Sequence, residues 1–310
     1  MRADVALPVL RPTTTRGAAP RHRRRSTEGG AWRLLAPAFA IEVVFVLLPI
    51  GICLWNSFHR MDFLERTAFV GLDNYLAVVT SGYFLRSLGV TLTFSVFALV
   101  FTFGLGFALA VFLERDSRLN VFGRAVVLVP YVISMLVGSL LLRWLILPDA
   151  GLLSLALAGL GFGEVSILAD PTKAMAALVA NAVWRDCAFA TILLMAGLKS
   201  VPLQIYQAAS IDGASRWYQF RRITVPLLKI PIQITLARLL IHFVNAVTFP
   251  LVLTNGGPNG ATETMGLALY RLGFANFQLS EANALAIMVL LFNLALVYLL
   301  FRVTRARRSG

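Results

Sequence analysis

An all-α integral membrane protein with six transmembrane helices is the fold class that the sequence predicts, and three observations lead to it. First, 58% of the 310 residues are hydrophobic and only 14% are charged, whereas about a quarter of residues are charged in soluble domains. Second, six apolar segments are each long enough to cross a hydrocarbon core about 30 Å thick. Third, the basic residues flank these segments instead of being spread along the chain.

The apolar segments are predicted to be helices because an open strand in lipid leaves its backbone groups unpaired. Their limits are 34–56, 87–113, 121–147, 173–197, 227–254 and 282–302. The run from Leu34 to Leu54 is predicted to be a retained first transmembrane helix, because it is long and no A-x-A-type cleavage site follows it closely. Residues 1–33 are expected to be a disordered basic cytoplasmic tail, and residues 303–310 form a second basic cytoplasmic tail.

Charge distribution orients the spans. The 114–120 connection carries Arg115 and Arg118, and the 198–226 connection carries Lys199, Arg221 and Arg222 among its cations. The opposite loops are richer in acidic residues, so the positive-inside rule places both termini in the cytoplasm. Flanking clusters of this kind also account for the net charge of +13, and nucleic-acid binding is not predicted.

The connections between spans differ in character. Residues 57–86 form a long periplasmic or extracellular loop with several aromatic side chains, and residues 87–302 form the core of the protein. The 148–172 segment is rich in Gly and Leu and is expected to contain a short helix. The 255–281 loop opens with a strong turn signal, Asn255 to Gly260, which is predicted to close the helix before it.

The sequence lacks the residue sets that enzymes use. No G-x-S-x-G or H-E-x-x-H pattern is present, so no catalytic residue and no enzymatic activity are predicted. No metal site is predicted either, because the two cysteines lie in apolar runs and the three histidines show no ligand spacing. An ATP-binding P-loop is excluded because none of the lysines, Lys173, Lys199 and Lys229, follows the required glycine run.

The 198–226 loop is the most informative stretch of the chain. Pro202 stands where a helix can begin, and a short helix is predicted over Gln204 to Ile211, ended by Gly213. A second short helix is predicted over Ala214 to Arg222, with Trp217 and Phe220 available to fix the hairpin to the membrane helices. Such a rigid hairpin can transmit the motion of a partner protein, although the pattern alone is equally typical of an ordinary amphipathic surface loop.

This loop resembles the EAA motif of ABC importer permeases, and it also fits the longer form found in carbohydrate importers. The residues that match are Gln207, Ala208, Ala209, Asp212, Gly213, Ala214, Phe220, Ile223, Thr224 and Pro226. The resemblance implies that the loop couples the membrane helices to an ATPase subunit. Gln207 replaces the usual Glu, whose carboxylate helps to hold the ATPase, and Gln keeps the hydrogen-bonding capacity without the charge.

Two further stretches resemble the same family. Leu253 to Pro258 is similar to the L-T-x-G-G-P that ends the fifth core span in the first permease of sugar importers, and Phe69 to Tyr75 resembles an outer-loop segment of those subunits. The resemblance covers about residues 32–305. It implies the six-helix, MetI-like permease fold of the maltose and glycerol-phosphate importers, in the inner, cytoplasmic membrane.

The resemblance also implies partners. A second homologous permease subunit, two ABC ATPase subunits and an extracytoplasmic solute-binding protein are expected around this chain, with lipid on its outer surface. ATP and Mg would be bound by the ATPase partner, and no cofactor is expected in this chain. The function implied is import of a sugar or related polyol, and the alternative is a secondary transporter or channel for a small polar solute.

Polar residues inside the spans are candidates for the solute pathway, because ionisable groups in lipid are costly and should face protein or water. Thr235, Arg238, His242, Asn245 and Thr248 are spaced to share one face of a fifth-span helix. In the fourth span, Trp184 and Arg185 accompany Asn181. The alternatives are that the stripe contacts the partner permease, that Arg238 pairs with Glu42 or Asp186, and that Trp184 is a packing residue.

Overall fold

A computed structural model describes residues 28–148, 150–162 and 166–306. The chain divides into two compact units, residues 1–50 and 51–310, which are described separately. In the first unit, α1 (Glu28–Glu42) is followed by the π-helical segment η1 (Val43–Leu47) and the beginning of α2 (Leu48–Ser57). Helix therefore starts at Glu28, inside the predicted tail of residues 1–33, and the rest of that tail lies outside the described residues.

By length and composition, four helical stretches in the described residues can cross a membrane, and two bent helix pairs raise the number of crossings to as many as six. The continuous candidates are Leu35–Ser57, Tyr83–Leu113, Pro171–Lys199 and Leu279–Arg302. They match four of the predicted segments to within a few residues. Numerous large apolar side chains on these helices are exposed, as expected of a surface that lipid covers.

The 57–86 connection departs from the predicted all-α fold. It holds an antiparallel pair of short strands, β1 (His59–Asp62) and β2 (Glu65–Phe69), followed by α3 (Asp73–Thr80). The sequence gives no hairpin signal because Phe63 and Leu64 occupy the turn, where Asn-Gly is the favoured pair. Phe63 adopts a left-handed conformation with φ of 53°, which is uncommon for a bulky side chain.

Three helices form the main core of the second unit. The helix α4 (Tyr83–Leu113) packs along α8 (Pro171–Lys199), and both contact α12 (Lys229–Val244). Phe94, Leu178 and Phe243 are fully buried between them. Gly106 permits the close approach of α4 and α8, because a Cβ at this position would lie 2.5 Å from the Cβ of Ala190.

The third predicted span, 121–147, is wrong as a single helix. It consists of α5 (Arg118–Val132) and α6 (Met135–Leu145), which are bent by 94° relative to each other. Ile133 and Ser134 at the bend have ψ values of 136° and 138°, so the backbone there is extended. Apolar composition continues through the bend, which is why hydropathy alone did not reveal it.

The fifth predicted span, 227–254, is also wrong as a single helix. The helix α12 ends at Val244, and the chain resumes as the π-helical segment η4 (Pro250–Thr254). At its other end α12 is preceded by α10 (Arg216–Gln219), η3 (Phe220–Thr224) and α11 (Val225–Leu227), with a bend of 66° between that stretch and α12.

Short helices occupy the remaining connections. As predicted, the 148–172 segment contains a short helix, α7 (Leu152–Leu157), which leads into η2 (Ala158–Phe162). After the turn at Asn255 to Gly260 come α13 (Met265–Tyr270) and η5 (Arg271–Ala275), and then α14 (Leu279–Ala306). A second core forms where α3, α12, α13 and α14 meet, around Val244, Met265 and Leu285.

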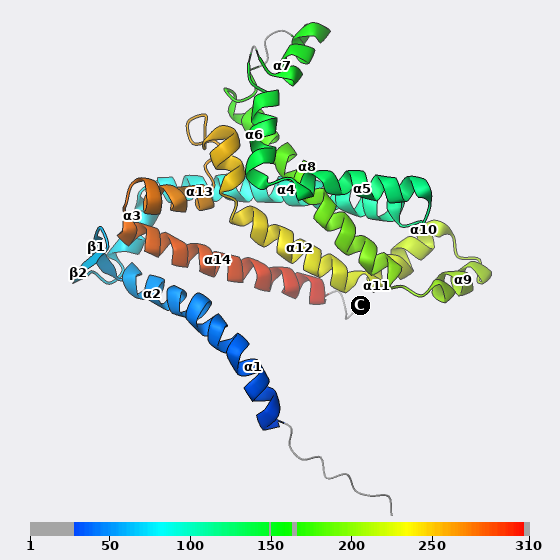
Figure 1. Ribbon diagram of the computed structural model, residues 1–310, viewed down its shortest axis with the longest axis horizontal. Helices are drawn as coiled ribbons and strands as arrows, with labels where there is room; N and C mark the ends of the chain where they lie inside the picture. The colour runs from blue at the N-terminus through cyan, green and yellow to red at the C-terminus, as the bar shows by residue number, and fades with distance from the viewer. Residues whose placement is uncertain (1–27, 149, 163–165, 307–310) are drawn as a thin grey trace, which may run out of the picture. The chain divides into compact units, whose positions relative to one another are not determined.

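The second unit has two distinct ends. The helices α9 (Leu203–Ile211) and α10 lie at one end of the long helices, and strands β1 and β2 lie at the other end (Figure 1). The α4–α5 connection lies at the α9–α10 end, because Lys199 at the end of α8 is bonded to Asp116 in that connection. The two basic connections therefore share one end, as the charge pattern requires.

Candidate functional site

The predicted two-helix hairpin is present at 203–219. Pro202 precedes α9, and Gly213 separates α9 from α10 with φ of 77°. A residue with a Cβ is strained at this φ, which is why the sequence uses glycine for the reversal. Ser215 then caps α10 by accepting a hydrogen bond from the Tyr218 amide at 3.3 Å.

Side-chain hydrogen bonds make the hairpin a single unit. The Gln219 side-chain amide donates to Ser210 Oγ and to the Ala214 carbonyl, both at 3.0 Å. The hydroxyls of Tyr206 and Thr224 are 3.0 Å apart and join α9 to the segment after α10. The bonds of Gln219 with Ser210 and of Tyr206 with Thr224 cross the glycine turn, so the two short helices can move together.

Phe220 attaches the hairpin to the long helices. Its ring meets the Phe107 ring of α4 edge to face, with 5.8 Å between centroids. Trp217 stacks on Phe220 at 5.7 Å but remains 68% exposed. The expectation that both aromatic residues anchor the hairpin therefore holds directly for Phe220 only, and Trp217 presents most of its surface outward.

Five of the nine predicted coupling residues lie on the outer surface of the hairpin. Gln207, Ala208, Asp212, Gly213 and Pro226 are exposed, whereas the other four predicted coupling residues are half-buried, namely Ala209, Ala214, Phe220 and Ile223. An open groove of about 700 Å³ runs over the turn between the two helices. Small side chains line much of this groove, which leaves room for a protruding side chain of a partner protein.

An ion-pair cluster that sequence analysis missed lies at the base of the hairpin. Asp116 Oδ1 is 2.9 Å from Lys199 Nζ and 3.0 Å from Arg124 Nη2. The hydrogen bond from Lys199, followed by that from Arg124, holds the pKa of the Asp116 carboxyl below its usual value. Asp116 thus links the end of α8 to the α4–α5 connection, and no local sequence pattern relates these positions.

The predicted pathway residues of α8 and α12 meet at the interface of these two helices. Asp186 is fully buried, and its carboxylate lies 3.4 Å from Arg185 Nη1 and 3.3 Å from His242 Nε2. The Arg185 guanidinium also lies over the Tyr131 ring, 5.3 Å from its centroid. We call Arg185, Asp186, Arg238 and His242 the polar cluster.

Arg238 does not pair with Asp186 in the described part of the chain. Its guanidinium instead lies over the Phe189 ring, 4.5 Å from the centroid. His242, one turn further along α12, takes the position beside Asp186. Trp184 is 41% exposed, and its ring packs on Gly138 of α6.

The polar cluster has unused hydrogen-bonding capacity. Among the described residues, four of its buried atoms lack a hydrogen-bond partner: Arg185 Nε, Asp186 Oδ2, Arg238 Nη1 and His242 Nε2. Asp186 Oδ2 and His242 Nε2 therefore lie within ion-pair distance, at 3.3 Å, but do not form a hydrogen bond. Because buried polar atoms are nearly always bonded, these four atoms are available to water or to the hydroxyls of a solute.

The break after α12 separates the last two predicted pathway residues from the helix. Asn245 caps α12, and its side chain exchanges hydrogen bonds of 3.2 Å with Asn293 of α14. Thr248 lies beyond the break, so the prediction that it shares one helical face with Arg238 is wrong. Asn293 was missed in the sequence, where an amide within the apolar last segment was its only signal.

The turn after η4 is held by a charged network. Arg271 donates to Glu263 Oε1 at 2.6 Å and to the Asn255 carbonyl at 2.7 Å. The Tyr83 hydroxyl donates to the same carboxylate oxygen of Glu263. Asn255 and Gly256 adopt φ of 49° and 73°, as the turn signal of the sequence predicts. The network joins this turn to the beginning of α4 and to η5.

The bundle of long apolar helices and the surface hairpin are as expected of a membrane transport subunit, and comparison with known proteins identifies the class. Residues 102–309 match the family described as "Binding-protein-dependent transport system inner membrane component". The chain is 34% identical over 280 residues to the trehalose/maltose transport system permease protein MalF of Thermococcus litoralis, covering 89% of this chain and 94% of that protein. It is 33% identical over 279 residues to the sn-glycerol-3-phosphate transport system permease protein UgpA of Agrobacterium fabrum, covering 88% and 94%.

The fold of this chain is also similar to that of a chain in a solved transporter structure. A chain of a bacterial alginate ABC transporter, solved in complex with an alginate pentasaccharide-bound periplasmic protein, superposes with a TM-score of 0.79 at 22% identity. That likeness covers 91% of this chain and 96% of the other.

This chain belongs to the binding-protein-dependent transport system inner membrane component family. The resemblance to ABC importer permeases that the coupling loop indicated is confirmed. The protein is a multi-pass membrane permease subunit, and its relatives are transport subunits rather than enzymes. The roles of the individual hairpin and cluster residues stay predictions.

Proposed function

We propose that this chain is the transmembrane subunit of an ATP-driven importer for a sugar or related polyol in the inner, cytoplasmic membrane. In this proposal each bent helix pair is one crossing, so the chain crosses six times and both termini are cytoplasmic. The names of the relatives support the solute class, since one transports trehalose and maltose and another sn-glycerol 3-phosphate. ATP and Mg are bound and ATP is hydrolysed on a separate ATPase subunit.

The observation that carries the proposal is the hairpin. Five of its motif residues are exposed at one end of the long helices, while Phe220, another motif residue, packs on Phe107 of α4. An ATPase that binds the outer surface of the hairpin can therefore move α4 through the contact between Phe220 and Phe107. It can also move α12, because α10 continues through η3 and α11 to the 66° bend that precedes α12.

Alternating access follows from this linkage. A solute-binding protein delivers the solute at the end of the bundle opposite to the hairpin. Closure of two ATPase subunits then displaces the hairpin of this chain and its counterpart in a second, homologous permease. Displacement of α12 relative to α8 changes the contacts of the polar cluster, which is where a polyhydroxyl solute would find unused hydrogen-bonding atoms.

Reconstitution tests this function. The permease pair, the ATPase and the binding protein are placed in proteoliposomes, and uptake of labelled maltose, trehalose and sn-glycerol 3-phosphate is measured with and without ATP. We expect uptake that requires ATP, the ATPase and the binding protein together. Uptake driven by an ion gradient without ATP would contradict the proposal and favour a secondary transporter. Purification in mild detergent without any associated ATPase would also contradict it.

A further inference from the structure

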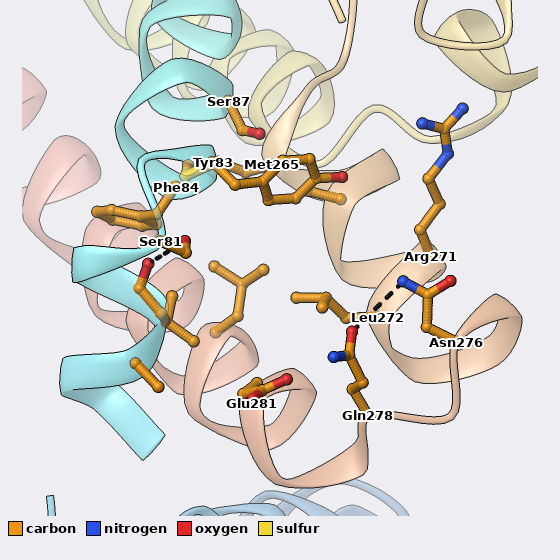
Figure 2. A pocket seen from close by; sticks show the side chains of 14 residues that line it. Ser81, Tyr83, Phe84, Ser87, Met265, Arg271, Leu272, Asn276, Gln278 and Glu281 are labelled. Carbon is orange, nitrogen blue, oxygen red and sulfur yellow. Dashed lines mark hydrogen bonds between the residues drawn. The ribbon is translucent and has the colours of Figure 1, made fainter. Parts of the chain in front are cut away.

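A cavity of about 500 Å³ lies between α3, α4, α13 and α14, at the end of the second unit opposite to the hairpin. Figure 2 shows it bounded by side chains from these helices and from the 276–278 connection. Its volume lies within the range of about 300–1,000 Å³ that is typical of small-molecule sites. The polar cluster lies on other helix faces, and its residues do not line this cavity.

Several polar groups of the lining have unused hydrogen-bonding capacity. Ser87 is only 2% exposed, and no hydrogen bond to its hydroxyl is found within the described residues. The same holds for the Glu281 carboxylate, which is half-buried at the beginning of α14. Gln278 accepts a bond of 3.4 Å from Asn276 through its oxygen, and this leaves its amino group free in the described part of the chain. A buried hydroxyl without a partner facing a cavity is typical of a ligand site.

The charges around the cavity favour a neutral ligand. Arg271 contributes to the lining, but its guanidinium is bonded to Glu263 and Asn255 and extends away from Glu281 and Gln278 in Figure 2. The carboxylate of Glu281 is thus the charged group that remains for a ligand. A carboxylate accepts hydrogen bonds from hydroxyls and repels phosphates and other anions.

Apolar surface completes the lining. The rings of Tyr83 and Phe84 and the side chain of Met265 line the cavity. A mixture of aromatic rings, a carboxylate, amides and hydroxyls suits a molecule that has both C–H faces and many hydroxyl groups. A purely apolar occupant such as an acyl chain would leave Ser87 and Glu281 without partners, at a desolvation cost.

We propose that this cavity is a second binding site, for a neutral polyhydroxylated solute of the size of a mono- or disaccharide. Ser87, Gln278 and Glu281 bond its hydroxyls, and Tyr83 and Phe84 contact its C–H faces. The inference rests on the proposed function, because the orientation given there places the cavity on the side where the solute arrives. It adds a site distinct from the polar cluster.

The cavity is linked to the break after α12. Thr264, directly before the cavity wall α13, donates its hydroxyl to the Ala246 carbonyl at 2.7 Å. A Cβ on Gly266 would lie 2.9 Å from that same oxygen, so α13 is packed directly on the break. Met265 is further fixed by its amide, which donates to Thr91 Oγ1 of α4 at 2.8 Å. Because α13 both lines the cavity and packs on the break, a ligand in the cavity would affect the segment that connects α12 to η4.

A binding measurement on the whole importer tests the inference. The permease pair with its ATPase is placed in nanodiscs without the binding protein, and binding of labelled maltose and of labelled sn-glycerol 3-phosphate is measured by equilibrium dialysis. We expect saturable binding of maltose, with sn-glycerol 3-phosphate bound at least about tenfold more weakly because of Glu281. Tighter binding of the phosphate ester at this cavity would overturn the assignment of a neutral ligand.

Variants assign the binding to the cavity. Ala77→Phe places a ring in the cavity from an exposed position of α3, so it should abolish the cavity-dependent binding without disturbing the core. Glu281→Gln should weaken maltose binding about tenfold through loss of a charge-assisted hydrogen bond. Glu65→Gln, at an exposed carboxylate of β2 that does not line the cavity, is the matched control and should bind like the original protein.

The two proposals fail separately. ATP-driven uptake with no maltose binding, or with maltose binding that Ala77→Phe leaves unchanged, overturns the second site and leaves the proposed function intact. Absence of ATP-driven uptake for every solute overturns the proposed function, even where maltose binding sensitive to Ala77→Phe supports the cavity site.

Discussion

The hairpin at 203–219 and the polar cluster differ in how completely their polar groups are hydrogen-bonded. In the hairpin, exposed and half-buried side chains complete local hydrogen bonds, such as those from Gln219 to Ser210 and to Ala214. In the polar cluster, buried atoms of Arg185, Asp186, Arg238 and His242 have no hydrogen-bond partner among the described residues. In the proposed mechanism the hairpin keeps one shape while it is moved, and the cluster changes its partners.

The energetic consequences differ accordingly. Loss of an exposed polar contact costs little, because water replaces it. A buried charge that loses its partner is destabilising by about 3–5 kcal/mol. Substitutions in the hairpin should therefore affect coupling with little effect on stability, whereas substitutions in the cluster should affect stability, solute binding or both.

The largest effect on transport is expected from Gly213→Val. A β-branched residue is strained at φ of 77°, at a cost of about 1–3 kcal/mol, and the reversal between α9 and α10 is lost. Uptake should fall by at least about tenfold while ATP hydrolysis and membrane insertion persist. Gly89→Val is the control, since Gly89 is a helical glycine with open space around it. Normal uptake by the Gly213 variant would show that the hairpin does not transmit motion.

Asp186→Ala probes the cluster by removing its one carboxylate. Arg185 would then lose its buried counter-charge and His242 its neighbouring carboxylate, and unfolding in detergent should become easier by about 3–5 kcal/mol. Asp186→Asn, which keeps the size and one acceptor oxygen, should recover part of the loss. A thermal unfolding curve unchanged in both variants would mean that the carboxylate is not needed to hold α8 against α12.

Arg238→Gln separates solute binding from stability within the cluster. Arg238 forms no ion pair with the described residues and contacts the Phe189 ring, so its removal leaves no carboxylate unpaired. The solute concentration for half-maximal uptake should change about tenfold, with little change in the amount of assembled importer. Unchanged transport kinetics would instead favour a role for Arg238 in packing or in contact with the second permease.

The smallest effect is expected from Gln207→Glu. Gln207 is exposed on α9, and a carboxylate there restores the usual residue of the motif. Association with the ATPase should strengthen by no more than about 1 kcal/mol and become more sensitive to salt. Pull-down titrations at low and high ionic strength measure the affinity for the ATPase and its dependence on salt. Weaker association of this variant would show that the hairpin contacts its partner differently from the family pattern.

Much of the hairpin could be predicted because its determinants are local. Pro202, Gly213 and the small residues between them specify two short helices and a reversal within a single stretch of chain. The prediction was less accurate where distant segments meet. Trp217 was expected to help fix the hairpin to the membrane helices and is exposed, because Phe220 makes the ring contact with Phe107 and Trp217 stacks on Phe220.

The polar cluster was predicted only in part, for the same reason. The spacing of Arg238 and His242 correctly placed them on one face of α12, but the sequence did not indicate which of them lies beside Asp186. The helical period also continued through Asn245 to Thr248, whereas the helix ends at Val244. The partner of Asn245 is Asn293 of α14, and no sequence spacing relates these two positions.

The sequence by itself determined four of the membrane-spanning segments, the two-helix hairpin and the family, because apolar length, glycine conformation and motif spacing are properties of neighbouring residues. Only the tertiary structure decided the 94° bend between α5 and α6, the pairing of Asp116 and Asp186 with their cations, and the cavity beside Glu281. These features depend on which side chains from separate helices fill the same space. Packing between helices sets them, and hydropathy is the same for several possible packings.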